Sequence, residues 1–183
     1  MLQCLHSDFY MGDPGRLPAD ASVAASMDGV RVDLIRHSTG CDSTESQSLI
    51  AEVGPGLEYP AEAVRALKGN CPQVLNPGVE VHVEENAVVF DFSNVAEPGR
   101  FPDGEFEGYM LDIVRTANAP VLISALVDLQ MSTGDVFEGD LGFDGDGLAV
   151  NLAGLAFDSN SVLRVDLYLV SVGGEADSSD STK

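Results

Sequence analysis

The sequence predicts an all-β protein: an antiparallel β-sandwich, jelly-roll-like in its strand spacing, with about eight to nine strands and one short helix. Apolar and polar residues alternate along several segments, as on a pleated strand that buries one face. Turn residues (Gly, Pro, Asn, Asp and Ser) interrupt these segments about every 8 to 12 residues, a spacing typical of sandwiches and jelly rolls. Helix-forming residues cluster in one segment, at 61–68.

The N-terminal residues 1–28 show neither a helical nor a strand period and contain Asp13-Pro14-Gly15, which predicts a flexible leader. Alternation begins at Val30 and predicts a strand over 30–34. A polar loop then leads to a second short strand over 49–53. We therefore expect the sandwich domain to cover residues 29–171.

The middle of the chain predicts a short helix followed by a hairpin. Pro60 precedes the helix-forming run 61–68 and Gly69 follows it, as expected for a helix start and stop. Residues 79–84 alternate regularly, and Glu85-Asn86 turns the chain back into a strand over 87–92.

Four further strands are predicted at 106–114, 121–129, 148–152 and 163–169. Asp144-Gly-Asp-Gly147 and Asp158-Ser-Asn-Ser161 are chain-reversal signals within this region. The acidic, low-complexity end 172–183 predicts a disordered tail. The alternation predicts a core that includes Val81, Phe90, Phe92, Ile123, Val127, Val150, Leu152, Leu163, Val165 and Leu167.

The 183 residues suffice for one domain, and the net charge of −21 restricts its partners. Such a surface repels nucleic-acid phosphates, so we expect no nucleic-acid partner. Three interpretations of the acidic surface stay open: solubility, a salty working environment, or binding of divalent cations. No run of 18 apolar residues is present, so we expect no transmembrane segment.

Three cysteines, Cys4, Cys41 and Cys71, form no Cys-x-x-Cys pair, so the sequence does not favour zinc or thioredoxin-like chemistry. Cys41 and Cys71 both lie in turn-rich segments, where a disulfide between them would suit an extracellular protein. Three unlinked thiols are the equal alternative.

Two acidic patches are candidate sites. The first patch consists of Asp135, Glu138, Asp140, Asp144 and Asp146. Loop carboxylates interleaved with glycines supply the oxygen ligands that calcium needs, so this patch predicts either a calcium site or no cofactor at all. Their spacing differs from the EF-hand pattern, and turn-forming aspartates are the simpler interpretation. The second patch surrounds the predicted hairpin and consists of Glu80, Glu84, Glu85 and Asp91; its simplest interpretation is a solvated face that discourages edge-to-edge pairing. His82 shares the outer strand face with Glu80 and Glu84. We expect His82 to be a solvated strand histidine, with an acid–base pair as the alternative.

A family resemblance adds to this interpretation. The segments Ala51-Glu-Val-Gly-Pro-Gly-Leu-Glu-Tyr59, the Val79-Glu-Val hairpin, Phe106-Glu-Gly-Tyr-Met-Leu-Asp112, Asp140-Leu-Gly-Phe-Asp144 and Val150-Asn-Leu-Ala-Gly-Leu-Ala-Phe157 together resemble a β-rich domain of bacterial exported proteins, notably those with PEP-CTERM-type sorting tails. The resemblance spans roughly residues 30–170. It implies an extracellular or cell-surface location, and it carries over no site residues because most such proteins have no assigned activity. The sequence shows neither a signal peptide nor the sorting tail, and a cytoplasmic location is the alternative.

These observations predict a non-enzymatic, exported or cell-surface sandwich with a structural, adhesive or matrix-interaction role, and a matrix, glycan or protein partner. The alternative is a carbohydrate- or ligand-binding jelly roll, calcium-dependent or not. Its candidate aromatic residues are Tyr10, Tyr59, Tyr109 and Tyr168. A hydrolase built on a carboxylate pair is the third hypothesis.

Overall fold

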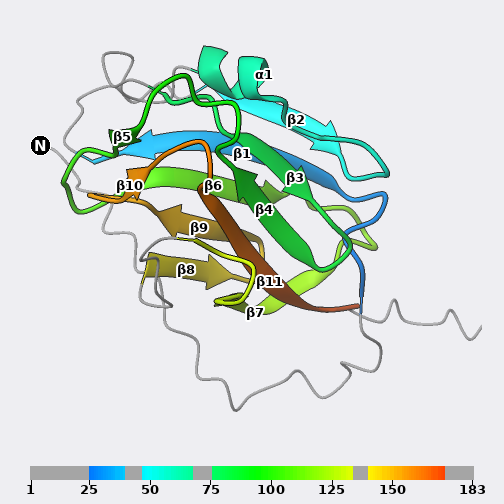
Figure 1. Cartoon of the computed structure of the whole chain (residues 1–183). Helices are drawn as coiled ribbons and strands as arrows, with labels where there is room; N and C mark the ends of the chain where they lie inside the picture. Colours follow the sequence, from blue (N-terminus) through cyan, green and yellow to red (C-terminus); the bar gives the residue numbers. More distant parts are fainter. Residues whose placement is uncertain (1–24, 40–46, 68–75, 134–139, 172–183) are drawn as a thin grey trace, which may run out of the picture.

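The computed structural model describes residues 25–39, 47–67, 76–133 and 140–171. These residues form two antiparallel sheets, packed face to face, and a two-stranded ribbon (Figure 1). Nine of the strands have four or more residues. The predicted all-β sandwich is confirmed.

One layer is a five-stranded sheet with the order β2-β1-β6-β9-β8, in which every neighbouring pair is antiparallel. The bounds are β2 Ser48–Glu52, β1 Arg31–Ser38, β6 Glu107–Ile113, β9 Gly147–Asn151 and β8 Leu141–Asp144. The chain reverses between β8 and β9 at the predicted Asp-Gly-Asp-Gly turn.

The other layer is a four-stranded antiparallel sheet with the order β3-β4-β11-β7. Its strands are β3 Glu80–Val83, β4 Ala87–Asp91, β11 Val162–Val170 and β7 Val121–Val127. The hairpin predicted around Glu85-Asn86 joins β3 to β4, and its turn is closed by the hydrogen bond from Glu84 N to Ala87 O at 2.8 Å.

Three short elements complete the described chain: the ribbon strands β5 (Gly99–Arg100) and β10 (Ala156–Phe157), and the helix α1 (Ala61–Ala66). The helix begins after Pro60, as predicted, and buries Ala61 and Val64. Its end is held by Asn76, whose Nδ2 donates to the carbonyl oxygens of Val64 (2.6 Å) and Leu67 (3.2 Å).

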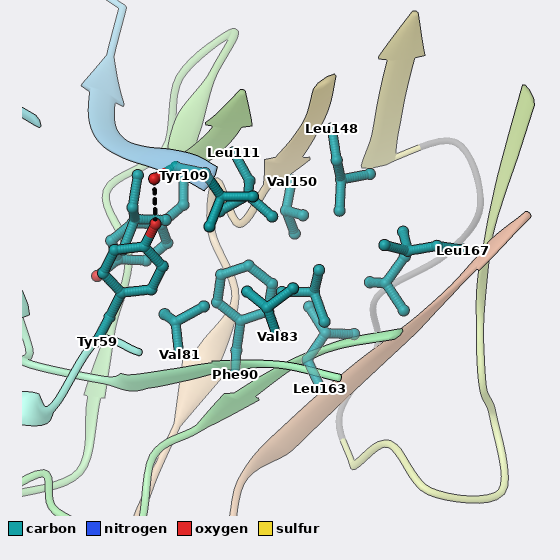
Figure 2. Packing of buried hydrophobic residues seen from close by; sticks show 14 of the residues in the cluster. Tyr59, Val81, Val83, Phe90, Tyr109, Leu111, Leu148, Val150, Leu163 and Leu167 are labelled. Carbon is teal, nitrogen blue, oxygen red and sulfur yellow. Dashed lines mark hydrogen bonds between the residues drawn. The ribbon is translucent and has the colours of Figure 1, made fainter. Parts of the chain in front are cut away.

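Side chains from both sheets fill the core between them (Figure 2). Nine of the ten residues predicted to be buried are at most 8% exposed. The prediction for Ile123 is wrong, since it is only partly buried, whereas Leu122 is 3% exposed. A β-bulge explains the difference: Tyr168 pairs with Ser124 and Leu169 with Leu122, so Ile123 is skipped and the inward positions shift by one.

A charged pair is buried in the core as well. Arg36 on β1 and Glu107 on β6 are 4% and 3% exposed and form an ion pair. The Arg36 guanidinium lies over the rings of Phe101 (5.7 Å) and Tyr109 (5.3 Å) and donates to Gly108 O at 2.9 Å. Ser38 donates to the second carboxylate oxygen of Glu107. Such burial is tolerated because each charge has a partner and further hydrogen bonds.

The described chain begins at Ala25, in the last part of the predicted leader. Met27 is fully buried, and its N–H donates to Glu85 O at 2.8 Å. Residues 25–28 therefore pack against the sandwich, whereas the rest of the predicted leader (1–24) and the predicted tail (172–183) lie outside the described residues.

Candidate functional site

The outer face of the four-stranded sheet carries a distinctive set of side chains, which we call the acidic sheet face. Because alternate residues of a strand point to opposite sides, the residues between the buried positions of β3, β4, β11 and β7 all lie on this face. Within the described part of the chain, no helix or strand covers it (Figure 1). The face consists of Glu80, His82, Glu84, Val89, Asp91, Leu126, Asp128, Val162, Arg164, Asp166 and Tyr168.

Arg164 organises the centre of the acidic sheet face. Its guanidinium contacts three carboxylates, those of Glu84 (2.7 Å), Asp166 (3.0 Å) and Asp128 (3.8 Å). Hydrogen bonding to Glu84, followed by that to Asp166, raises the pKa of Arg164. These contacts restrict the side chains of Arg164, Glu84 and Asp166.

Two apolar side chains are exposed beside this network. Tyr168 on β11 is 49% exposed and Leu126 on β7 is 38% exposed. Leu126 pairs with Asp166, two residues before Tyr168, so Leu126 and Tyr168 are diagonal neighbours on one face, within reach of each other. Neighbouring exposed aromatic and aliphatic side chains are typical of the centre of a binding surface.

His82 has a buried partner that the sequence did not reveal. Its Nδ1 lies 2.8 Å from Glu58 Oε2, and the Glu58 side chain is only 2% exposed. The same carboxylate accepts hydrogen bonds from the N–H groups of Val83 (2.9 Å) and Gly54 (3.2 Å). Because a carboxylate accepts, Nδ1 of His82 carries a proton.

Glu58 also explains how the edge of β3 is protected. Next to it, Tyr59 exchanges two backbone hydrogen bonds with Val81, at 3.1 and 3.0 Å. The Glu58 carboxylate accepts a hydrogen bond from the N–H of Val83, the next outward-pointing backbone N–H along the same edge of β3. Side-chain capping of this kind limits pairing with other chains.

A shallow groove of about 350 Å³ lies around His82. Its polar lining consists of His82 and the carboxylates of Glu80, Glu84 and Asp91. Its apolar lining consists of the aliphatic side chains of Leu57 and Val89. The arrangement offers hydrogen-bond acceptors beside an aliphatic surface. It therefore suits a long cationic side chain, which has an apolar stem and a charged end.

The residues predicted to bind calcium are in part engaged otherwise. Asp144 Oδ1 accepts from the N–H groups of Asp146 (2.8 Å) and Gly147 (2.9 Å), as in an Asx turn. Asp146 forms an ion pair with Arg115. Asp140 and Arg100 both line a second groove. Asp135 and Glu138 lie outside the described residues.

Among the residues that the structure describes, no group of three or more His, Cys, Asp or Glu side chains is placed to hold a metal ion. The calcium site thus stays a prediction. The same is true of the Cys41–Cys71 disulfide, because all three cysteines fall outside the described ranges.

The other residues singled out in the sequence have structural positions. Tyr59 and Tyr109 are each 1% exposed, and burial raises the pKa of both hydroxyls well above the usual range. Tyr168 alone, of the predicted aromatic candidates that are described, reaches the surface; Tyr10 is outside the described residues. His37 packs on Phe106 with ring centroids 5.7 Å apart, and burial lowers its pKa.

A second carboxylate group lies on the outer face of the five-stranded sheet. Asp33 and Asp112 are directly opposite each other on β1 and β6, and Asp144 follows across Gly147. Asp33 Oδ1 is buried without a hydrogen-bond partner. Burial, together with the charges of Asp33 and Asp144, raises the pKa of Asp112. These groups repel one another in the folded protein.

We expect Asp112→Asn to increase the free energy of unfolding at neutral pH by about 0.5–1 kcal/mol, since it removes one repelling charge. A raised carboxyl pKa destabilises the folded state above that pKa, and the penalty is relieved as pH falls and the folded state takes up the proton first. The gain should therefore shrink between neutral and acidic pH in urea unfolding. Glu52→Gln, on an exposed edge position, is the control. A loss of stability at every pH would contradict the repulsion.

Comparison with known proteins does not extend these observations: no protein-family model, no curated protein and no solved structure matches this chain. No helix in the described ranges is long and apolar enough to cross a membrane.

Proposed function

We propose that this protein is a non-enzymatic, exported or cell-surface β-sandwich that acts by binding a macromolecular partner, in a structural, adhesive or matrix-interaction role. The observation that carries the proposal is that half-exposed Tyr168 and its diagonal neighbour Leu126 lie on a sheet face that no described helix or strand covers. Tyrosine is a frequent energetic centre of interfaces, because it buries a large rigid ring and keeps a polar end.

The surroundings of this pair support a protein as the partner. Ion-paired carboxylates around Arg164 form a polar rim beside the apolar side chains, which is the usual anatomy of a protein–protein interface. The net charge of −21 disfavours nucleic acids and anionic membranes. Tyr168 is a single ring, whereas a sugar-binding platform would gain from several.

We expect the purified protein to bind identified proteins on a protein array and to lose at least about fivefold in affinity on Tyr168→Ser, because truncating an interface hot spot costs more than 1 kcal/mol. Ile50→Ser is the matched control, since Ile50 is 57% exposed but lies on β2 of the other sheet. A glycan array, with and without calcium, is measured in parallel. Hits confined to glycans would favour the carbohydrate-binding alternative, and no binding that depends on Tyr168 would contradict the proposal.

A further inference from the structure

We infer that the partner of the acidic sheet face is a protein segment in which lysine or arginine side chains flank an apolar side chain. The inference rests on the proposed function and names the chemistry of its partner. It follows from three features of the face: its charge, the groove around His82, and the distance from that groove to the exposed side chains of Leu126 and Tyr168.

The charge of the face is strongly asymmetric. Five carboxylates lie on it, at Glu80, Glu84, Asp91, Asp128 and Asp166. Arg164 is the one arginine or lysine among its residues, and it is already shared among three of the five carboxylates. Among the described residues, Glu80 and Asp91 form no ion pair, so a cationic partner gains attraction there and long-range steering during association.

The same charge argues against a second copy of this chain as the occupant. Two molecules would each bring a net charge of −21 and place like-charged faces together. Like-charge juxtaposition across an interface is costly and acts as selection against the wrong partner. The apolar pair Leu126 and Tyr168 is too small by itself to overcome this repulsion.

The groove around His82 fits the end of such a side chain. A lysine or arginine stem can lie along Val89 and Leu57, with its charged end near Glu80 and Asp91. Glu58 Oε2 lies 2.8 Å from Nδ1 of His82, at the edge of this groove. The buried Glu58 carboxylate, with two backbone donors of its own, keeps this imidazole in one orientation.

The geometry of the sheet gives the spacing of the partner's side chains. His82 on β3 and Leu126 on β7 are separated by three strand-to-strand spacings across the sheet and by two residues along the strand direction. With strands about 4.8 Å apart and about 6.6 Å for two residues along a strand, the separation is about 16 Å. An extended segment covers that distance in about five residues. Side chains an even number of residues apart share one face of an extended segment, so the apolar side chain and the cationic one should be about four residues apart, with the long cationic stem covering the remaining distance.

The inference is tested with a fluorescein-labelled ten-residue peptide that carries lysines four residues from leucines, titrated with the full chain at low salt. Matched peptides replace every lysine by glutamate, or every leucine by serine. We expect binding to the lysine–leucine peptide, a loss of at least about fivefold on Tyr168→Ser or Leu126→Ser, and a loss of about threefold with a shallower salt dependence on Glu80→Gln. Ile50→Ser and Glu52→Gln, exposed on β2, should bind as the unchanged protein does.

Chemical shifts of the His82 ring, the Tyr168 ring and the Leu126 methyl groups should move together on titration, whereas those of Ile50 should not. Absence of binding, equal losses for Glu80→Gln and Glu52→Gln, or self-association that buries Tyr168 would overturn the inference. A protein-array partner that depends on Tyr168 but does not compete with the lysine–leucine peptide would overturn the inference and leave the proposed function intact.

Discussion

Gly108→Ala should destabilise the sandwich more than any other single-methyl change that we consider. Gly108 lies on β6 opposite Asn151 on β9, and a Cβ at this position would overlap the carbonyl oxygen of Val150. The obstacle is backbone in a central strand pair, so no side-chain rotation relieves it. We expect a loss of about 3 kcal/mol or more in the free energy of unfolding, measured by urea denaturation.

Gly56→Ala is the control for Gly108→Ala. A Cβ at Gly56 would have no atom within 4 Å, and the residue lies in the loop after β2. We expect a change of less than about 1 kcal/mol, with a small gain from the reduced freedom of the unfolded chain. Equal effects of the two substitutions would show that β6 and β9 are able to separate without cost.

Arg36→Met should be the second large effect, because it leaves the Glu107 carboxylate charged and buried without its cation. Removing one partner of a buried ion pair costs about 3–5 kcal/mol. Glu107→Leu should cost a comparable amount, since it strands the Arg36 guanidinium between Phe101 and Tyr109.

The double variant Arg36→Met/Glu107→Leu separates the pair from its surroundings. A buried pair replaced by apolar side chains of similar size costs little, so the double variant should be more stable than either single variant. Urea unfolding of the unchanged protein, the two single variants and the double variant completes a double-mutant cycle. Strictly additive losses would mean that the two side chains do not act as a pair.

The strands that match their sequence prediction best are those whose alternation is complete. Residues 79–84 alternate without interruption, Glu85-Asn86 supplies the turn, and both strands of the hairpin lie where the sequence predicts. For β1, the predicted strand stops at residue 34, whereas the structure continues it to Ser38. The two inward positions that follow are Arg36 and Ser38, which a pattern of apolar residues excludes. The Glu107 carboxylate makes their burial possible, because it pairs with the Arg36 guanidinium and accepts a hydrogen bond from Ser38; it lies 71 residues beyond Arg36 in the chain.

Ile123 shows a second limit of the pattern. Its apolar run predicts a regular strand, but the inward phase of β7 depends on where β11 pairs with it. The bulge opposite Tyr168 and Leu169 is a property of the strand pair, so it leaves no periodic signal in β7 alone. One skipped residue transfers the core position from Ile123 to Leu122.

Among the residues of the candidate surface, the sequence predicted the outward direction of His82, Glu80 and Glu84, because residues two apart share a strand face. It also offered Tyr168 as a binding residue, among four tyrosines. Burial distinguished them: Tyr59 and Tyr109 are in the core, whereas Tyr168 lies on the outer face beside Leu126. Glu58 was missed, since a single glutamate 24 residues before His82 gives no signal of contact.

The amino-acid sequence by itself determined the fold class, most strand positions, the helix that follows Pro60 and the acidic surface, because these follow from local periodicity, turn residues and composition. Only the tertiary structure decided which strands are neighbours, which charged groups are buried together, and which carboxylates share one face. These properties depend on pairing between distant segments, whose register is set by the packing of the whole sandwich. The acidic sheet face, assembled from β3, β4, β11 and β7, is therefore a product of that pairing.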